Sequence, residues 1–259
     1  MRKFLVYLII FGGIVGLPAF SKTITGKIKK EENINTNRIY DVENNTPIEG
    51  AIVRLPSKKY SAITDKQGTF KLETKINAPT IMSVEKDGYK PFSMSLSENN
   101  KNPIIVGIEK TSPNDIIIET DMIHLGDNSF SINSAHANDF SLNAIGSVFS
   151  KEFIINPLKE NETATLIIGS IIGIDTMQAR TLKQSNVKTA YSSPPEIFCN
   201  GHKIAEIKIN GDNQKINIPK SILSKNRLVN ISIKTGKNLF KNDLDFDDIE
   251  FTNILLEIK

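Results

Sequence analysis

Apolar and polar side chains alternate along short stretches of this chain, and the alternation predicts β-strands. In the clearest stretch, Ala51, Val53 and Leu55 share one parity and the two residues between them take the other. That is the period of a strand with one buried face. Similar stretches recur roughly every ten residues as far as Ile108 without a helical period, a spacing typical of a β-sandwich.

Three short turns are predicted to join neighbouring strands as hairpins. They are Asp65-Lys66-Gln67-Gly68, Asn200-Gly201 and Gly211-Asp212. Glycine adopts the positive φ that a tight turn needs, and Asp or Asn can hydrogen-bond to its own backbone. The first turn is expected to pair residues 60–64 with residues 69–73, and Asn-Gly is the strongest short hairpin signal.

The second half of the chain repeats the strand pattern. Further strands are expected at residues 116–118, 153–155, 196–199, 203–209, 216–218 and 229–233 and from Ile249 onward. Residues 123–138 are expected to form a loop. The apolar run 164–174 favours a strand because of its β-branched residues, with a buried helix as the alternative. A β-bulge near Thr252–Asn253 would bring Phe251 and the later apolar residues to one face.

Four motifs in the first half occur in a recognisable order: Gly26-Lys27-Ile28, Pro47-Ile48-Glu49-Gly50-Ala51-Ile52-Val53, Thr64-Asp65-Lys66-Gln67-Gly68-Thr69-Phe70 and Gly88-Tyr89. With these motifs residues 23–110 resemble the carboxypeptidase regulatory-like domain, a small transthyretin-like sandwich. The resemblance implies a non-catalytic module. It departs from the family at Lys30–Tyr40, which lengthens the first connection. No histidine is followed by Glu three residues later, as a zinc-binding His-x-x-Glu would require.

Residues 115–259 carry a second resemblance, in Ile197-Phe198-Cys199-Asn200-Gly201-His202-Lys203-Ile204, Ile218-Pro219-Lys220-Ser221-Ile222-Leu223, Leu228-Val229-Asn230-Ile231-Ser232-Ile233 and the closing Asp247–Leu256. These segments are similar to the galactose-binding-like jelly roll of carbohydrate-binding modules. The resemblance implies a sugar-binding domain, often with a structural calcium ion.

The chain begins with Met1-Arg2-Lys3, an uncharged run to Phe20, and small residues at Ala19 and Ser21. This pattern predicts a secretory signal peptide at residues 1–21, with an uncleaved anchor helix as the alternative. The full reading is an all-β chain of two β-sandwich domains. Residues 22–110 form the transthyretin-like sandwich, 111–114 a linker and 115–259 the jelly roll.

Charge and cysteine content narrow the functional classes. The 32 Lys and Arg residues nearly balance the 29 Asp and Glu residues, and signal cleavage would remove Arg2 and Lys3. A dedicated nucleic-acid surface needs a concentrated basic stripe, so no nucleic-acid partner is expected. The single cysteine, Cys199, excludes an internal disulfide and is expected to be a small buried hydrophobic residue in a strand.

The most acidic run, Asn242–Glu250, supplies the candidate metal site. Its candidate ligands are Asp245, Asp247, Asp248 and Glu250. Calcium binds six to eight oxygen ligands, so carboxylates at this spacing suit it. The run is not an EF-hand loop, because Asp248 stands where the sixth-position Gly is needed. A solvated acidic turn is the alternative.

Other chemistry is weakly indicated. His124 with Asp127, or His136 with Asp139, has the composition of an acid–base pair, but no nucleophile accompanies either. Sugar rings usually stack on aromatic faces, and the chain has no Trp. Tyr191 and the loop Asn128–Asn138 are the candidate positions for sugar contact.

These observations predict a secreted, periplasmic or cell-surface protein without catalytic activity and without a membrane span after signal cleavage. The jelly roll would bind a glycan or another cell-surface polymer, and the first sandwich would act as a spacer. One alternative is a structural or protein-interaction component of a bacterial envelope, whose partner would be an envelope protein. A small hydrolase, which would require two carboxylates facing a cleft, is the third hypothesis.

Overall fold

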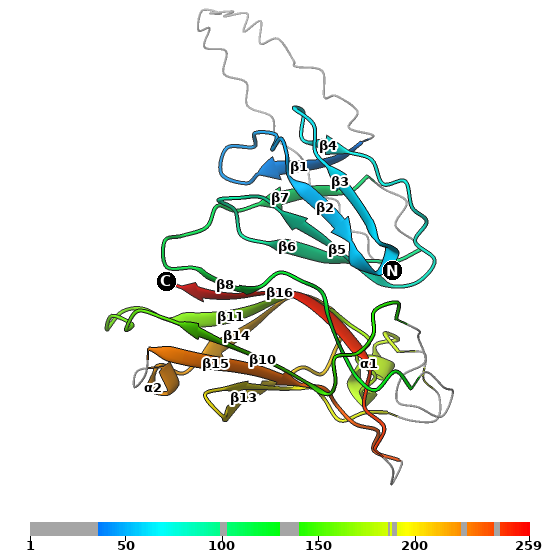
Figure 1. The fold of residues 1–259 in the computed structure, drawn as a ribbon, viewed down its shortest axis with the longest axis vertical. Helices are drawn as coiled ribbons and strands as arrows, with labels where there is room; N and C mark the ends of the chain where they lie inside the picture. Colours follow the sequence, from blue (N-terminus) through cyan, green and yellow to red (C-terminus); the bar gives the residue numbers. More distant parts are fainter. Residues whose placement is uncertain are drawn as a thin grey trace, which may run out of the picture. The chain divides into compact units, whose positions relative to one another are not determined.

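The computed structural model describes residues 36–98, 103–129, 140–185, 187, 191–223, 227–240 and 244–259 (Figure 1). The expected signal peptide and the Gly26-Lys27-Ile28 motif lie outside them. Residues 34–259 form one compact unit. Its described elements are nearly all strands, which confirms the all-β class.

Residues 37–108 form two sheets with a hydrophobic core. The first has the order β3-β2-β5-β6 and the second β4-β1-β7. The strands are β1 (Asn37–Asp41), β2 (Ile52–Leu55), β3 (Tyr60–Ile63), β4 (Thr69–Phe70), β5 (Thr80–Glu85), β6 (Phe92–Leu96) and β7 (Ile105–Ile108), with a 3-10 turn at Pro56–Lys58. The predicted parity in β2 is confirmed, because Ala51, Val53 and Leu55 are fully buried in this core.

Residues 116–258 form two further sheets. One has the order β14-β11-β16-β8, with β9 also paired to β16, and the other the order β10-β15-β12-β13. The elements are β8 (Ile116–Glu119), β9 (Ile123–Leu125), β10 (Val148–Ile154), β11 (Ala164–Ile172), α1 (Met177–Thr181), β12 (Glu196–Cys199), β13 (His202–Glu206), β14 (Gly211–Ile218), α2 (Lys220–Leu223), β15 (Leu228–Lys234) and β16 (Ile249–Ile258). None of the described helices is long and apolar enough to cross a membrane.

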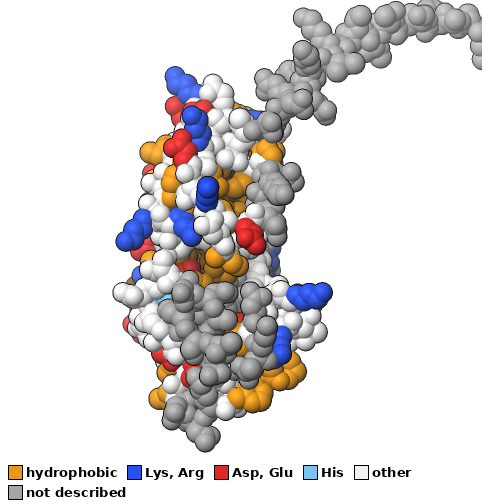
Figure 2. Space-filling view, turned by 90° about the vertical axis from the view of Figure 1, so that its right-hand side faces the viewer, with side chains coloured by type: hydrophobic (Ala, Val, Ile, Leu, Met, Phe, Trp, Pro, Cys, Tyr) orange, Lys and Arg blue, Asp and Glu red, His pale blue; other side chains and the backbone are white. Residues whose placement is uncertain are grey.

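Every described pairing between these strands lies within residues 37–108 or within residues 116–258. The domain boundaries assigned from the sequence stay a prediction. Charged side chains of both signs lie interspersed on the face in Figure 2, so the described residues there form no continuous basic stripe.

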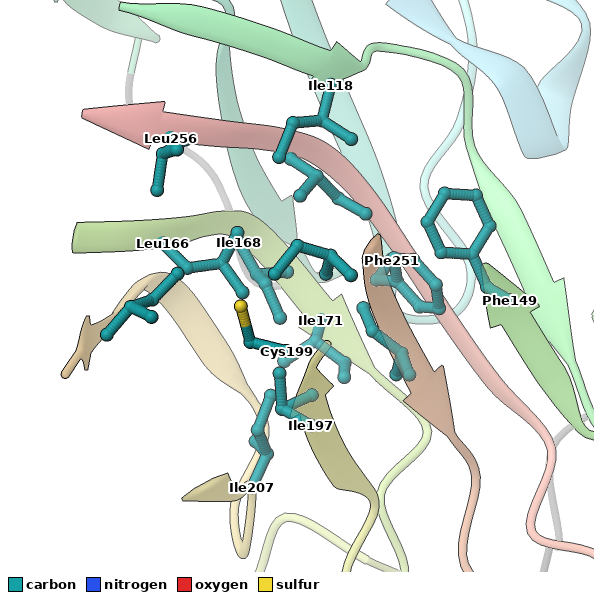
Figure 3. Close-up of a cluster of buried hydrophobic side chains, with 14 of the residues drawn as sticks. Ile118, Phe149, Leu166, Ile168, Ile171, Ile197, Cys199, Ile207, Phe251 and Leu256 are labelled. Atoms are coloured by element: carbon teal, nitrogen blue, oxygen red, sulfur yellow. The ribbon is translucent and has the colours of Figure 1, made fainter. Parts of the chain in front are cut away.

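The core of the C-terminal half lies between its two sheets (Figure 3). Leu166, Ile168 and Ile171 of β11 and Phe251 and Leu256 of β16 are fully buried in it. Cys199 is buried there as well, as predicted. Residues 164–172 are a strand, so the alternative of a buried helix is wrong.

Three local predictions are wrong. The turn at Asp65–Gly68 forms, with Gly68 at φ 70°, but β3 pairs with β2 while β4 pairs with β1. The turn therefore carries the chain from one sheet to the other. Gly211 and Asp212 lie inside β14, which pairs with β11 and not with β13. Residues 123–125 are strand β9, because their backbone pairs with residues 249–251.

The two central strands of the C-terminal half change parity at the same level. In β11 the core-facing residues change from Leu166 and Ile168 to Ile171, and in β16 from Phe251 to Ile254. Asn253 has a positive φ of 59° at this point, where the sequence predicts an irregularity. The pairing of β16 with β8 shifts register one residue later, after Ile254.

The sheet β3-β2-β5-β6 packs against the outer face of the sheet β14-β11-β16-β8. The contacts run from β5 and β6 to β11, β14 and β16. Ile81 and Leu255 are buried but belong to neither core cluster. This contact also buries hydroxyl and amide side chains, Ser93 and Asn253 among them.

Candidate functional site

The acidic segment Asp245–Glu250 leads into β16 with its four carboxylates buried. Asp247 and Glu250 are 0% exposed, and Asp245 is 4% exposed. This excludes the alternative of a solvated acidic turn. Buried carboxylates are costly unless they are paired or hydrogen-bonded, so their partners decide what they do.

Asp248 and Glu250 share an environment with His124. The Nε2 of His124 lies 2.8 Å from Asp248 Oδ1, and its Nδ1 donates to the carbonyl oxygen of Leu142 at 2.6 Å. Glu250 is the cross-strand neighbour of His124 in the β16–β9 pair. The sequence-based pairing of His124 with Asp127 is wrong, because Asp127 Oδ2 accepts from the backbone N–H of Phe246. His136 and Asp139 lie outside the described residues.

The protonation of this group follows from its contacts. Burial alone would lower the pKa of His124, but hydrogen bonds to Asp248 and Leu142 outweigh it and the pKa is raised. Burial raises the pKa of Glu250 to about 7, and the charge of His124 opposes that rise. Both carboxylate oxygens of Glu250 and Oδ2 of Asp248 have no hydrogen-bond partner among the described residues. Neutral pH therefore leaves Glu250 divided between its two protonation states.

Asp247 and Asp245 have other partners. Asp247 Oδ2 accepts from the hydroxyl of Ser192 at 2.5 Å and from the backbone N–H of Asp175 at 3.2 Å. Burial and the neighbouring Asp175 carboxylate raise the pKa of Asp247 well above its ordinary value. Asp245 Oδ2 accepts from the side-chain amide of Asn238 at 2.8 Å.

The four predicted ligands therefore do not converge on one point. Within the described ranges no group of three or more His, Cys, Asp or Glu side chains is arranged to hold a metal ion. The residues present do not fit one calcium ion held by all four carboxylates. Calcium at this segment stays a prediction, and Asp248 and Glu250 are the members of the set that lie together.

The contacts of Asp245 and Asp247 position a partly exposed aromatic cluster. Ser192, which Asp247 binds, is joined by backbone bridges to Thr176 before α1 and to Asn238. Thr176 caps α1, since its hydroxyl accepts from the N–H of Ala179 at 3.1 Å. These contacts bring α1, residues 191–193 and residues 236–240 side by side.

Gly236 permits the closest of these approaches. A Cβ at Gly236 would lie 1.8 Å from the carbonyl oxygen of Ser193, so any other residue would force the two segments apart. Ser193 donates its N–H to the carbonyl of Lys237 at 2.9 Å, and its hydroxyl accepts from the N–H of Lys237 at 3.1 Å.

The aromatic platform consists of Tyr191, Phe240 and Arg180. The rings of Tyr191 and Phe240 meet edge to face with centroids 4.7 Å apart. The guanidinium carbon of Arg180 lies 5.4 Å from the centroid of Tyr191. Phe240 is 60% exposed. Tyr191, the ring under Arg180, is half-buried. An exposed ring such as that of Phe240 can stack against the C–H face of a sugar, and a guanidinium can bind the polar groups of a sugar.

Sequence reasoning named Tyr191 but missed Phe240 and Arg180. Arg180 and Phe240 are 60 positions apart in the chain, and only the strand pairing around Ser192 brings them together. The Asn-rich loop that the sequence also favoured lies almost entirely outside the described residues.

No protein-family model matches the chain, and no curated protein matches it. Both resemblances described above therefore stay predictions.

Proposed function

We propose that this chain is an exported, non-catalytic binding protein that holds a glycan or another cell-surface polymer on its C-terminal sandwich. The observation that carries the proposal is the aromatic platform of Tyr191, Phe240 and Arg180. Its support is buried and hydrogen-bonded through Ser192, Asp247 and Asn238. A preorganised platform loses little conformational entropy on binding.

Export and an envelope location are inferred from the N-terminal sequence. The N-terminal sandwich acts as a spacer. A neutral or acidic polysaccharide fits the platform best, because Arg180 places a guanidinium beside the rings. Guanidinium groups bind carboxylates in a bidentate geometry that suits uronic acids.

The test is retention of the mature chain on immobilised polysaccharides and on a glycan array. Phe240→Ala is expected to weaken retention by about tenfold, equivalent to about 1.4 kcal/mol. Phe198→Ala is the matched control, because Phe198 in β12 is also an aromatic ring beside a cation: Lys234 Nζ of β15 lies 4.5 Å from its centroid. Equal loss in both variants, or no retention of the unmodified chain on any polymer, would reject the proposal.

A second function, docking of an envelope protein, is favoured by aliphatic side chains on the same segments. The exposed fractions are 59% for Met177, 58% for Leu239 and 77% for Leu244. Exposed apolar patches often mark protein-binding surfaces. A stoichiometric partner that co-purifies with the unmodified chain and is lost in Leu239→Ser would support this function. A partner retained by that variant would exclude this surface.

A further inference from the structure

A cleft of about 450 Å³ lies where the two halves of the compact unit meet. Its walls come from β6 and β7 of the first half and from β11, β14 and β16 of the second. The volume falls within the range of small-molecule sites. The cleft shares no lining residue with the aromatic platform.

Two buried polar side chains that line the cleft have no hydrogen-bond partner among the described residues. Asn253 is 1% exposed, and neither its amide oxygen nor its amide nitrogen has a hydrogen-bond partner among the described residues. Ser93 is 4% exposed, and its hydroxyl also lacks a partner there. A buried polar group without a partner destabilises the fold, so these two side chains are positioned to bind a polar molecule in the cleft.

The backbone at the same point is unusual. Asn253 has a φ of 59°, which a non-glycine residue seldom adopts. Gly169 stands beside it, and a Cβ there would lie 2.4 Å from Ser93 Oγ and 2.8 Å from Asn253 Cβ. Glycine is therefore needed for the two halves to approach this closely, and its absence of a side chain keeps Ser93 and Asn253 adjacent. Strain and unpaired polar groups often coincide at binding sites.

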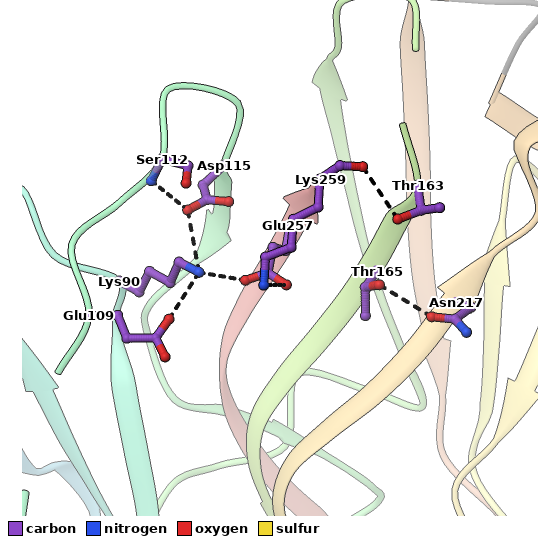
Figure 4. A network of polar contacts seen from close by, with 9 residues as sticks. All are labelled: Lys90, Glu109, Ser112, Asp115, Thr163, Thr165, Asn217, Glu257 and Lys259. Carbon is purple, nitrogen blue, oxygen red and sulfur yellow. Dashed lines mark hydrogen bonds and ion pairs between the residues drawn. The ribbon is translucent and has the colours of Figure 1, made fainter. Parts of the chain in front are cut away.

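Charge around the cleft is balanced. Its lining includes three cations and three carboxylates: Lys90, Lys215, Lys259, Glu109, Asp212 and Glu257. Lys90 is already paired with carboxylates (Figure 4). Its Nζ donates to Glu257 and lies 3.3 Å from Oε2 of Glu109 and 3.7 Å from Oδ2 of Asp115. Asp212 accepts from the N–H of Ser95 at 2.9 Å. A charged ligand would have to displace these pairs, so a neutral ligand is favoured.

Ile167 and Leu255, cross-strand neighbours on the outer face of β11 and β16, give the cleft its apolar wall. The cleft presents the amide of Asn253 and the hydroxyl of Ser93 together with apolar side chains. It therefore matches a neutral ligand that carries both hydroxyl groups and C–H groups. An amide that donates and accepts can bind two adjacent hydroxyl groups at once.

We infer that the cleft between the two halves binds a small neutral polyhydroxylated molecule, of the size of one or two sugar units. Asn253 and Ser93 supply the hydrogen bonds, and Ile167 and Leu255 pack against the C–H groups of the ligand. The inference does not depend on the platform, because the two sites use different residues.

Binding is tested by titrating the full mature chain and following its backbone NMR shifts. The neutral probes are glucose, N-acetylglucosamine and lactose, and glucuronate is the charged probe. At least one neutral sugar is expected to bind and glucuronate to bind at least about tenfold more weakly. Asn253→Gly removes the amide while tolerating the positive φ, and it should weaken binding by about tenfold or more. Asn45→Gly is the matched control, because Asn45 is exposed with a φ of 56°.

Each outcome either supports or overturns the cleft as a sugar site. Loss of sugar binding in Asn253→Gly, with binding kept in Asn45→Gly and Phe240→Ala, supports the inference. Ser93→Ala provides the same test if Asn253→Gly does not fold. The inference is overturned if no neutral sugar binds, if both Asn253→Gly and Ser93→Ala bind normally, or if Phe240→Ala alone abolishes binding. In the last case the platform and not the cleft is the sugar site.

Discussion

Replacement of Glu250 by Gln should stabilise the protein at high pH. Glu250 is fully buried, and both of its carboxylate oxygens lack partners among the described residues. Its pKa is about 7 in the folded protein against 4.5 for the ordinary group, and burial is the main cause. Because the folded state holds this proton more tightly, stability falls as pH rises from 4.5 to about 7 and then stays at the lower value.

The size of the effect follows from that difference. A rise from 4.5 to about 7 corresponds to about 3.5 kcal/mol at about 1.4 kcal/mol for each pH unit. Gln has nearly the same shape and no charge to bury, so Glu250→Gln should recover up to about 3.5 kcal/mol above pH 7. The gain should shrink between about pH 7 and 4.5 and vanish below that range.

The assay is urea unfolding followed by circular dichroism at pH 5 and pH 8 with EDTA present. Glu152→Gln is the matched control, since Glu152 is an exposed residue of β10. Equal stability of Glu250→Gln and the unmodified chain at pH 8 would refute the reasoning. Repeating the pH 8 series with calcium tests the metal prediction. Calcium that stabilises the unmodified chain but not Glu250→Gln would support a site at Glu250, and no calcium effect would count against it.

Two further outcomes are expected. Lys90→Met should cost about 2 kcal/mol at pH 7, because Asp115 would lose this cation and Glu257 would keep only Lys259. The cost should shrink at pH 3. Burial alone would raise the pKa of Glu257, but hydrogen bonds from Lys259 and Lys90 lower the pKa, so the stabilisation from these contacts is lost as pH falls. Urea unfolding of Lys90→Met at pH 7 and pH 3 measures the cost, and an equal cost at both pH values would contradict this explanation. Cys199 should resist Ellman's reagent in the native protein and react on unfolding, because burial raises its pKa to about 11; rapid native labelling would show that this core opens readily.

The aromatic platform shows where sequence reasoning stops. Tyr191 could be named from the sequence as a candidate, since an aromatic residue in a polar stretch is visible there. Phe240 and Arg180 could not, because nothing in local pattern shows that residues 176, 192 and 238 form neighbouring bridges. The same limit explains why the sequence grouped four acidic residues as ligands of one calcium ion. Spacing along an acidic run does not reveal which carboxylates hydrogen-bond to Ser192, Asn238 or His124.

The alternation of side chains determined the all-β class and most strands, and the Asn-Gly pair determined the hairpin at Asn200-Gly201. Both could be predicted from the sequence because a strand's period and a tight turn's φ requirements are local properties. Which strands share a sheet was decided only by tertiary structure. The turns at Asp65–Gly68 and before β14 both carry the chain between sheets and not back along one. Burial of carboxylates and the cleft beside Asn253 also depend on contacts between distant segments, since desolvation and packing arise only when those segments meet.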